Sequence, residues 1–250
     1  MMSRRPLMYA APALLLLIFA CGSGEPPRPP ADPATAILVV NRSPGLPTTA
    51  EQWTLPDFTL YGDGTAVLPG ETRGALLTGV RRTVTAERIA EWYRTAQRAG
   101  LFTGRTHDRA IADAGALTVR ITDDAGTHET VVAGPEQDES GLRGEVIAFA
   151  ETVMAGGTDA GEYRPQRYAV LVTGASDGQG PARPWPLTVP LAQINGAPSE
   201  PCQVLPPEEA EPLMPEFAGA GPDTRWESQG QRVSLMMRPL LPDEHTCADL

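Results

Sequence analysis

A short glycine-rich stretch, GASDG at residues 174–178, spells the G-x-S-x-G pattern that surrounds the nucleophile of many serine hydrolases. In those enzymes a histidine, oriented by a carboxylate, removes the proton of the serine. His245 follows Ser176 in the required chain order, with Asp223 or Asp243 as the carboxylate. A serine hydrolase that uses Ser176 and His245 is therefore one hypothesis.

The residues around Ser176 do not favour this chemistry. The nucleophile normally sits on a tight turn between a strand and a helix. A strand is expected before Ser176, but the following GQGPARPWP cannot begin a helix soon enough, and there is no room for the usual parallel sheet. We therefore expect no catalytic residue, and the hydrolase remains the alternative.

The apolar run Met8–Ala20 carries no charged side chain. Arg4 and Arg5 precede it, and Cys21 follows it directly. This order is typical of an export signal, and the run is too short to cross about 30 Å of hydrocarbon as a helix. Residues 17–21, LIFAC, resemble the lipobox of bacterial lipoproteins, whose cysteine receives a diacylglyceryl group. The resemblance implies a signal peptide at 1–20 and a lipid anchor at Cys21, with palmitate-like acyl chains.

The segment after Cys21 suits such an anchor. Residues 21–35 contain PPRPP and no apolar run, which predicts an extended tether between the cell membrane and the folded part. A plain secretory signal with an unrelated cysteine is the alternative. Residues 3–7, SRRPL, resemble the twin-arginine export motif, whereas LLLLIF favours the general secretory route.

Two further cysteines, Cys202 and Cys247, remain once Cys21 is acylated. In the oxidising exterior an even pair most simply forms a disulfide, which would close a loop of about 45 residues and contribute about 4 kcal/mol. The alternative is a metal site with His245 and Asp243, but zinc sites usually have a second closely spaced ligand pair. We expect the disulfide, no metal and no cofactor.

The other polar clusters are typical of solvated turns. His107, Asp108 and Asp113 fall in one loop, and His128 falls on a hairpin. Neither GDG nor TDDAG supplies the closely spaced oxygen ligands of a calcium loop. Trp185, in the irregular ARPWP, is the tryptophan that we most expect at an interface.

Composition limits the partners. The chain has 250 residues and a formal net charge of -11, and loss of two leader arginines would make the mature protein more acidic still. An acidic protein repels nucleic acid, so no nucleic-acid partner is expected. The 25 glycines and 26 prolines predict many loops and turns.

Residues 36–154 predict one domain in the order strands, helix, strands, helix. AILVV and the hairpin DFTLYGDGTAVL come first, followed by a strand in LLTGVRRTV. A helix should run from the Thr85 cap to Gly100, and a hairpin of ALTVRITDD and THETVVAG leads to a second helix. This order is typical of a two-layer α+β domain, with helices on one face of a mostly antiparallel sheet. The first helix has the apolar stripe Ile89, Trp92, Tyr93 and Ala96, and the second has Leu142, Val146, Ile147, Phe149, Ala150 and Val153.

These motifs resemble a domain of unknown function that is widespread in bacterial lipoproteins and envelope proteins. The likeness rests on YGDGTAVLPG, on the helix ending in RAGLF and on the hairpin of alternating Thr and Val. It implies a fold and a location, and it supplies no catalytic residue.

A linker is predicted at 155–167, where glycines gather and apolar periodicity lapses. The proline-rich segment 168–250 then predicts a strand in YAVLVTG, a short or kinked helix in PPEEAEPLMPEF, and a hairpin of TRWES and QRVSLMMR. Its WPL and RPLLPDE motifs resemble the C-terminal part of actinobacterial lipoproteins.

The sequence thus favours a lipid-anchored protein on the extracytoplasmic side of the cell membrane. We expect a non-catalytic module that binds an envelope protein or a small ligand. The serine hydrolase is one alternative, and an inhibitor of a secreted hydrolase, suggested by fold analogy, is another.

Overall fold

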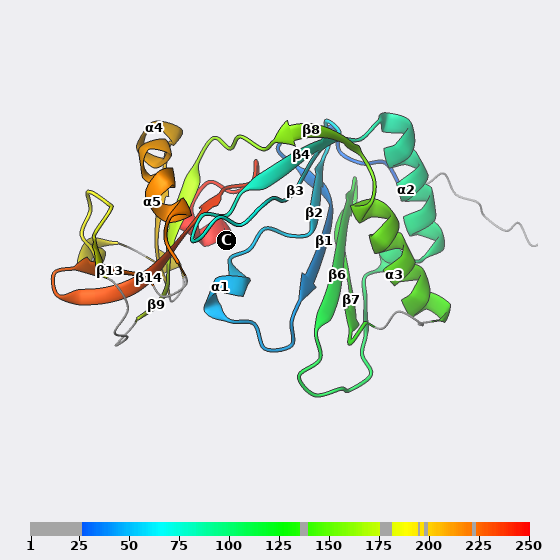
Figure 1. Cartoon of the computed structure of the whole chain (residues 1–250). Helices are drawn as coiled ribbons and strands as arrows, with labels where there is room; N and C mark the ends of the chain where they lie inside the picture. Colours follow the sequence, from blue (N-terminus) through cyan, green and yellow to red (C-terminus); the bar gives the residue numbers. More distant parts are fainter. Residues whose placement is uncertain (1–26, 136–139, 176–181, 195, 198–199, 222–223) are drawn as a thin grey trace, which may run out of the picture.

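The structure of the chain, a computed structural model, describes residues 27–135, 140–175, 182–194, 196–197, 200–221 and 224–250. Two β-sheets adjoin, and the two long helices cover the larger one (Figure 1). The larger sheet has the strand order β5-β7-β6-β1-β2-β3-β4-β8. Its strands are Ala36–Ser43 (β1), Phe58–Tyr61 (β2), Thr65–Pro69 (β3), Gly79–Thr83 (β4), Arg105–His107 (β5), Ala116–Asp123 (β6), Gly126–Ala133 (β7) and Thr158–Glu162 (β8).

The first long helix, α2 (Ala86–Arg98), forms as the sequence predicts. The Thr85 side chain accepts a hydrogen bond from the backbone N–H of Arg88, and the predicted apolar stripe is buried. The Tyr93 hydroxyl donates to the carbonyl of Ile37 at 3.1 Å and also to that of Thr122, so it fastens the helix to β1 and β6. Gly100, with φ +73, provides the left-handed residue after the helix.

The second long helix, α3 (Gly141–Met154), lies on the same face and buries five of the six predicted apolar residues. Leu142 is the exception, since it is 46% exposed. Its neighbour Arg143 donates to the carbonyls of His107 and Ala133, at the ends of β5 and β7. The first turn of α3 therefore lies at the end of the sheet, and Leu142 is partly exposed there.

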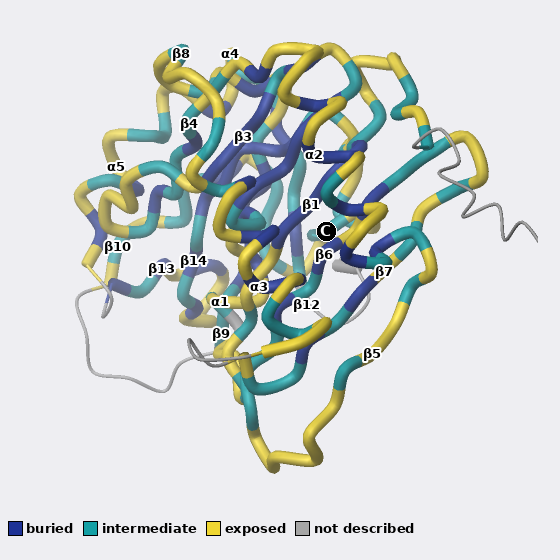
Figure 2. The backbone as a smooth tube through the Cα atoms, turned by 90° about the vertical axis from the view of Figure 1, so that its right-hand side faces the viewer, coloured by how far each residue is buried: buried dark blue, intermediate teal, exposed yellow. Residues whose placement is uncertain are grey.

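The opposite face of the central strands is buried as well, because consecutive residues of β2 and β3, which point to opposite faces, are buried (dark in Figure 2). Tyr61 of β2 and Val67 of β3 form a cluster on that face with Leu55 and Leu241. A solvated sheet face would carry polar residues at these positions. The C-terminal segment is thus a second cover for the larger sheet.

The smaller sheet belongs to the C-terminal segment and has the strand order β10-β13-β14-β9-β12-β11. The predicted hairpin is confirmed as β13 and β14, and its turn residues Gln229 and Gly230 both have positive φ. The strands of this sheet are Tyr168–Ala175 (β9), Ala182–Pro184 (β10), Gly196–Ala197 (β11), Glu200–Leu205 (β12), Arg225–Ser228 (β13) and Gln231–Pro239 (β14).

The remaining helices are short. Prolines interrupt the predicted PPEEAEPLMPEF helix, which divides into two α-helical pieces and an intervening 3₁₀ turn. The short α-helices are Thr49–Gln52 (α1), Pro207–Ala210 (α4) and Met214–Ala218 (α5), and the 3₁₀ turns are Leu101–Thr103 (η1), Leu191–Gln193 (η2), Glu211–Leu213 (η3) and Cys247–Asp249 (η4).

The predicted α+β class is confirmed: within the described residues, all strand pairs except β5–β7 and β10–β13 are antiparallel. The predicted linker at 155–167 differs, because it contains β8, which pairs with β4. As an exposed edge strand of sequence TDAGE, β8 has no apolar face to produce periodicity. The end of the predicted tether is also held against the fold, since Pro30 and Asp32 lie beside Gly62 in the β2–β3 turn.

Candidate functional site

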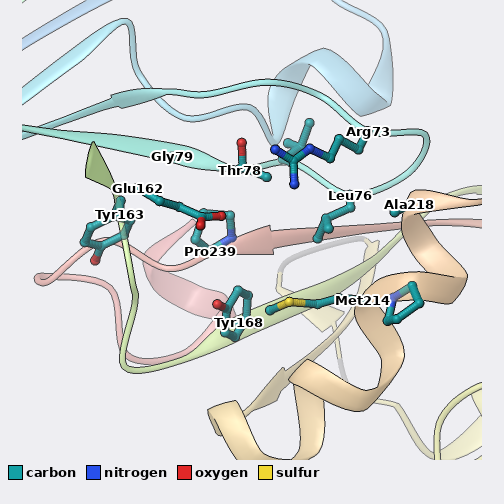
Figure 3. A pocket seen from close by; sticks show the side chains of 12 residues that line it. Arg73, Leu76, Thr78, Gly79, Glu162, Tyr163, Tyr168, Met214, Ala218 and Pro239 are labelled. Atoms are coloured by element: carbon teal, nitrogen blue, oxygen red, sulfur yellow. The ribbon is translucent and has the colours of Figure 1, made fainter. Parts of the chain in front are cut away.

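A cavity of about 200 Å³ lies where the two sheets meet, and we call it the junction cavity (Figure 3). Its walls come from segments far apart in the sequence. From the larger sheet, Leu76 and Gly79 approach it at the start of β4, and Glu162 ends β8. From the C-terminal segment come Tyr168 of β9 and Met214 of α5.

Backbone hydrogen bonds hold these walls together. The N–H of Leu77 donates to the carbonyl of Met237 at 2.8 Å, and the N–H of Met237 donates to the carbonyl of Ala75 at 2.8 Å. Ala75 in turn donates to the carbonyl of Phe217 at 2.9 Å. The segment before β4 therefore pairs with β14 and α5, which fixes the cavity in the fold.

The interior of the junction cavity is mostly apolar, with charge at its ends. Leu76, Met214 and Pro239 contribute apolar surface, whereas Figure 3 places Arg73 and Glu162 toward opposite ends. The guanidinium of Arg73 forms an exposed ion pair with Glu71 at 3.0 Å. This arrangement suits an apolar group whose ends carry polar atoms.

The hydroxyl groups at the junction cavity have defined roles. Thr78 Oγ1 donates to the carbonyl of Glu71 at 2.7 Å, and the Tyr163 hydroxyl donates to the carbonyl of Leu240 at 2.8 Å. Burial, reinforced by the nearby Glu211 and Glu162, raises the pKa of Tyr168. The phenol of Tyr168 therefore keeps its proton at neutral pH and can donate to a ligand.

A buried polar cluster, the clamp, lies beside the cavity and joins the two parts of the protein. Arg238 is 3% exposed and donates to both carboxylate oxygens of Glu244, at 2.8 and 2.5 Å. It also donates to the carbonyl of Trp53, and the Tyr61 hydroxyl donates to Asp243 at 2.7 Å. Burial raises the pKa of Glu244, and the Arg238 charge opposes that rise. The clamp is a structural contact, since each charged group in it already has a protein partner.

The predicted disulfide is confirmed. The sulfur atoms of Cys202 and Cys247 are 2.03 Å apart, and they link η4 to β12 of the smaller sheet. Both thiols are therefore used in the bond rather than as metal ligands. Among the described residues, no group of three His, Cys, Asp or Glu side chains is arranged to hold a metal ion.

Two of the residues proposed for a serine hydrolase, Asp243 and His245, lie within the described structure. Ser176 and Asp223 lie outside the described residues. His245 lies near the start of β9, because its carbonyl accepts a hydrogen bond from Arg167 at 2.9 Å. Asp243 is bonded to Tyr61 and not to His245.

Most of the other candidate residues make contacts with nearby protein groups. Asp108 accepts a hydrogen bond from the backbone of Ala110, and His128 lies 3.3 Å from Asp123 and packs edge-on against Phe102. Trp185 is only half-buried, and its ring N–H donates to the carbonyl of Val189. His107 is the exception, because it lines a separate cavity that is described below.

Sequence reasoning missed both the junction cavity and the clamp. Residues from distant segments of the chain build them, and spacing within one segment does not show how those segments meet. The one available signal was in RPLLPDE, where Arg238 and Glu244 flank the apolar Leu240 and Leu241.

The fold and the site define a two-sheet α+β protein with a pocket between its sheets. Comparison with protein-family models, with curated proteins and with solved structures found no match for this chain. Cys21 lies outside the described residues, and no described helix is long and apolar enough to span a membrane.

Proposed function

We propose that the chain is a lipid-anchored, extracytoplasmic module of the cell envelope that binds a partner and catalyses no reaction. Support for the address comes from the leader, from the lipobox ending at Cys21 and from the proline-rich segment that follows it. A disulfide also suits an oxidising compartment outside the cytoplasm.

The junction cavity is the observation that carries the binding role. Its apolar interior lies between two parts of the protein, which is a common place for ligand sites. At about 200 Å³ it is smaller than the roughly 300–1,000 Å³ typical of drug-sized ligands. Its size suits one apolar side chain of an envelope protein, with Arg73 and Glu162 available to polar atoms beside it.

Membrane attachment is tested by replacing Cys21. The Cys21→Ser variant should lose acyl label and move from the membrane fraction to the soluble extracytoplasmic fraction, because one residue carries the anchor. Retention of the variant in the membrane fraction, with its acyl label intact, would overturn the lipid anchor.

Binding is tested by photocrosslinking in intact cells. A benzophenone amino acid at Met214, which is half-buried at the cavity, should give a discrete crosslinked protein. The same group at Ala90, exposed on α2, is the matched control. Equal adducts at both positions, or none at Met214, would contradict a partner at the junction cavity.

Catalysis is tested separately with a fluorophosphonate probe on the purified chain. A binding module should remain unlabelled. Labelling of the parent chain that disappears in Ser176→Ala would establish a reactive serine and overturn the non-catalytic proposal.

A further inference from the structure

A second cavity, remote from the junction cavity, lies at the opposite edge of the larger sheet, and we call it the edge cavity. Its volume is about 230 Å³, and it is enclosed by the last turn of α2, the edge strand β5 and the first turn of α3. Arg98, Arg105, His107, Thr130 and Leu142 are among its lining residues.

The charge of the edge cavity differs from that of the protein as a whole. Two arginines and a histidine line it, and none of its described lining residues is acidic. The chain has 31 acidic residues against 20 arginines, so such a group is unusual here. A local positive potential attracts an anion even where the net charge is negative.

Strand pairing directs these side chains into one space. Arg105 pairs with Thr130 and His107 pairs with Val132, in parallel register. Thr130 and Val132 are buried under the helices, and Val132 belongs to the core there. Partners on adjacent strands share a sheet face, so Arg105 and His107 lie on the face covered by α2 and α3.

The two arginines and the histidine of the edge cavity are available to a ligand. Arg98 donates one hydrogen bond, to Thr95 Oγ1 at 3.0 Å. Across the described part of the chain, the side chains of Arg105 and His107 form no hydrogen bond or ion pair with protein. A guanidinium has five N–H donors, so most of the donor capacity of both arginines remains.

Thr130 adds an unsatisfied hydroxyl. It is 2% exposed, and its Oγ1 has no partner among the described residues. Buried polar side chains in native proteins are normally hydrogen-bonded, so an exception requires an explanation. A bound oxyanion at the edge cavity would accept a hydrogen bond from this hydroxyl.

We propose that the edge cavity binds a tetrahedral oxyanion, a phosphoryl group held by Arg98 and Arg105 with help from His107 and Thr130. Guanidinium groups bind phosphate with paired N–H donors, which gives both strength and geometry. A liquid water occupies about 30 Å³, so the cavity has room for this anion and several waters. The exposed Leu142 at its rim can contact an organic group attached to the phosphate.

The test is calorimetric titration of the purified full chain with inorganic phosphate at constant ionic strength. One saturable site is expected. Arg105→Gln should weaken binding at least about tenfold, and Arg98→Gln together with Arg105→Gln should abolish it. Arg94→Gln is the matched control, because Arg94 is exposed on the same helix and lines no cavity described here. Thr130→Val should weaken binding several-fold while it raises the melting temperature of the free protein.

The arginines could instead stabilise the end of a helix, and the same variants distinguish this role from phosphate binding. Cations near the end of a helix also stabilise its negative pole. The proposal is overturned if the parent chain shows no saturable phosphate binding and Arg105→Gln lowers the melting temperature. The arginines would then stabilise the end of α2. Equal weakening by Arg94→Gln and Arg105→Gln would also overturn it.

A titration with glycerol 3-phosphate distinguishes the source of the phosphoryl group. Tighter binding than inorganic phosphate supports a phosphoryl group carried by a larger molecule, in contact with Leu142. Equal binding supports the free anion. Acetate, which is planar, should bind at least several-fold more weakly than either, and equal binding of acetate would overturn the tetrahedral assignment.

Discussion

At the scale of single residues, we expect the buried pair Arg238–Glu244 to matter most for the stability of the fold. The two side chains are 3% and 12% exposed, so each is shielded from water and has the other as its charged partner. Glu244 also accepts a hydrogen bond from the N–H of Leu241 at 2.7 Å, which orders the start of the C-terminal loop.

Glu244→Ala should lower the free energy of unfolding by about 3–5 kcal/mol, because it leaves the Arg238 charge buried without its partner. Urea denaturation measures the loss. Glu227→Ala is the control: its pair with Arg232 is 44% exposed on both sides, so its removal should cost less than about 1 kcal/mol. Equal losses in the two variants would show that the clamp contributes no more than a surface ion pair.

At the scale of elements, the end of α3 packs tightly against α2. A Cβ atom at Gly156 would lie 2.4 Å from Cζ2 of Trp92, a rigid ring that is 2% exposed. Gly156→Ala should therefore destabilise the protein by about 1–3 kcal/mol, measured as a lower melting temperature. Gly174→Ala, with no atom within 4 Å of the added carbon, should change it little. An unchanged melting temperature in Gly156→Ala would contradict this packing.

The disulfide acts on another element, the C-terminal loop that carries Leu241, Asp243 and Glu244. Joining Cys202 to Cys247 closes a loop whose ends are 45 residues apart in sequence, which contributes about 4 kcal/mol on the chain-entropy model. Dithiothreitol should reduce the free energy of unfolding of the parent chain by an amount of this order. It should have no effect on the Cys202→Ala, Cys247→Ala double variant, whose response is the control.

At the scale of the whole molecule, the two sheets should unfold together. The C-terminal segment covers Tyr61 and Val67 of the larger sheet. Its Met237 also forms backbone hydrogen bonds with the segment before β4. Trp92 reports on the helix layer and Trp226 on the core of the smaller sheet. Variants that retain one of these tryptophans should show the same urea midpoint, since the parts share a buried interface. Two separate midpoints would indicate independent domains.

Removal of residues 168–250 tests the same dependence from the other side. The shortened chain would expose the apolar face formed by Leu55, Tyr61 and Val67. It should bind a hydrophobic dye and aggregate, because a solvated sheet face requires polar residues. A monomeric, folded fragment without dye binding would show that the larger sheet does not need its second cover.

The sequence by itself determined the local elements of this protein. The Thr85 cap, the apolar stripe of α2 and the Gln229–Gly230 turn follow from short-range hydrogen bonding and from side-chain periodicity, so residues within one turn or hairpin suffice to predict them. The Cys202–Cys247 pairing was predictable for a different reason, since only two cysteines remained once Cys21 was assigned to the lipid.

Only the tertiary structure decided how distant segments meet. The strand β8 was missed because an exposed edge lacks apolar alternation, although backbone hydrogen bonds to β4 hold it. The clamp, the junction cavity and the edge cavity each join residues from several elements. The properties of these sites depend on how deeply the side chains are buried and on how close their charges lie. Spacing along the chain predicts neither of these quantities.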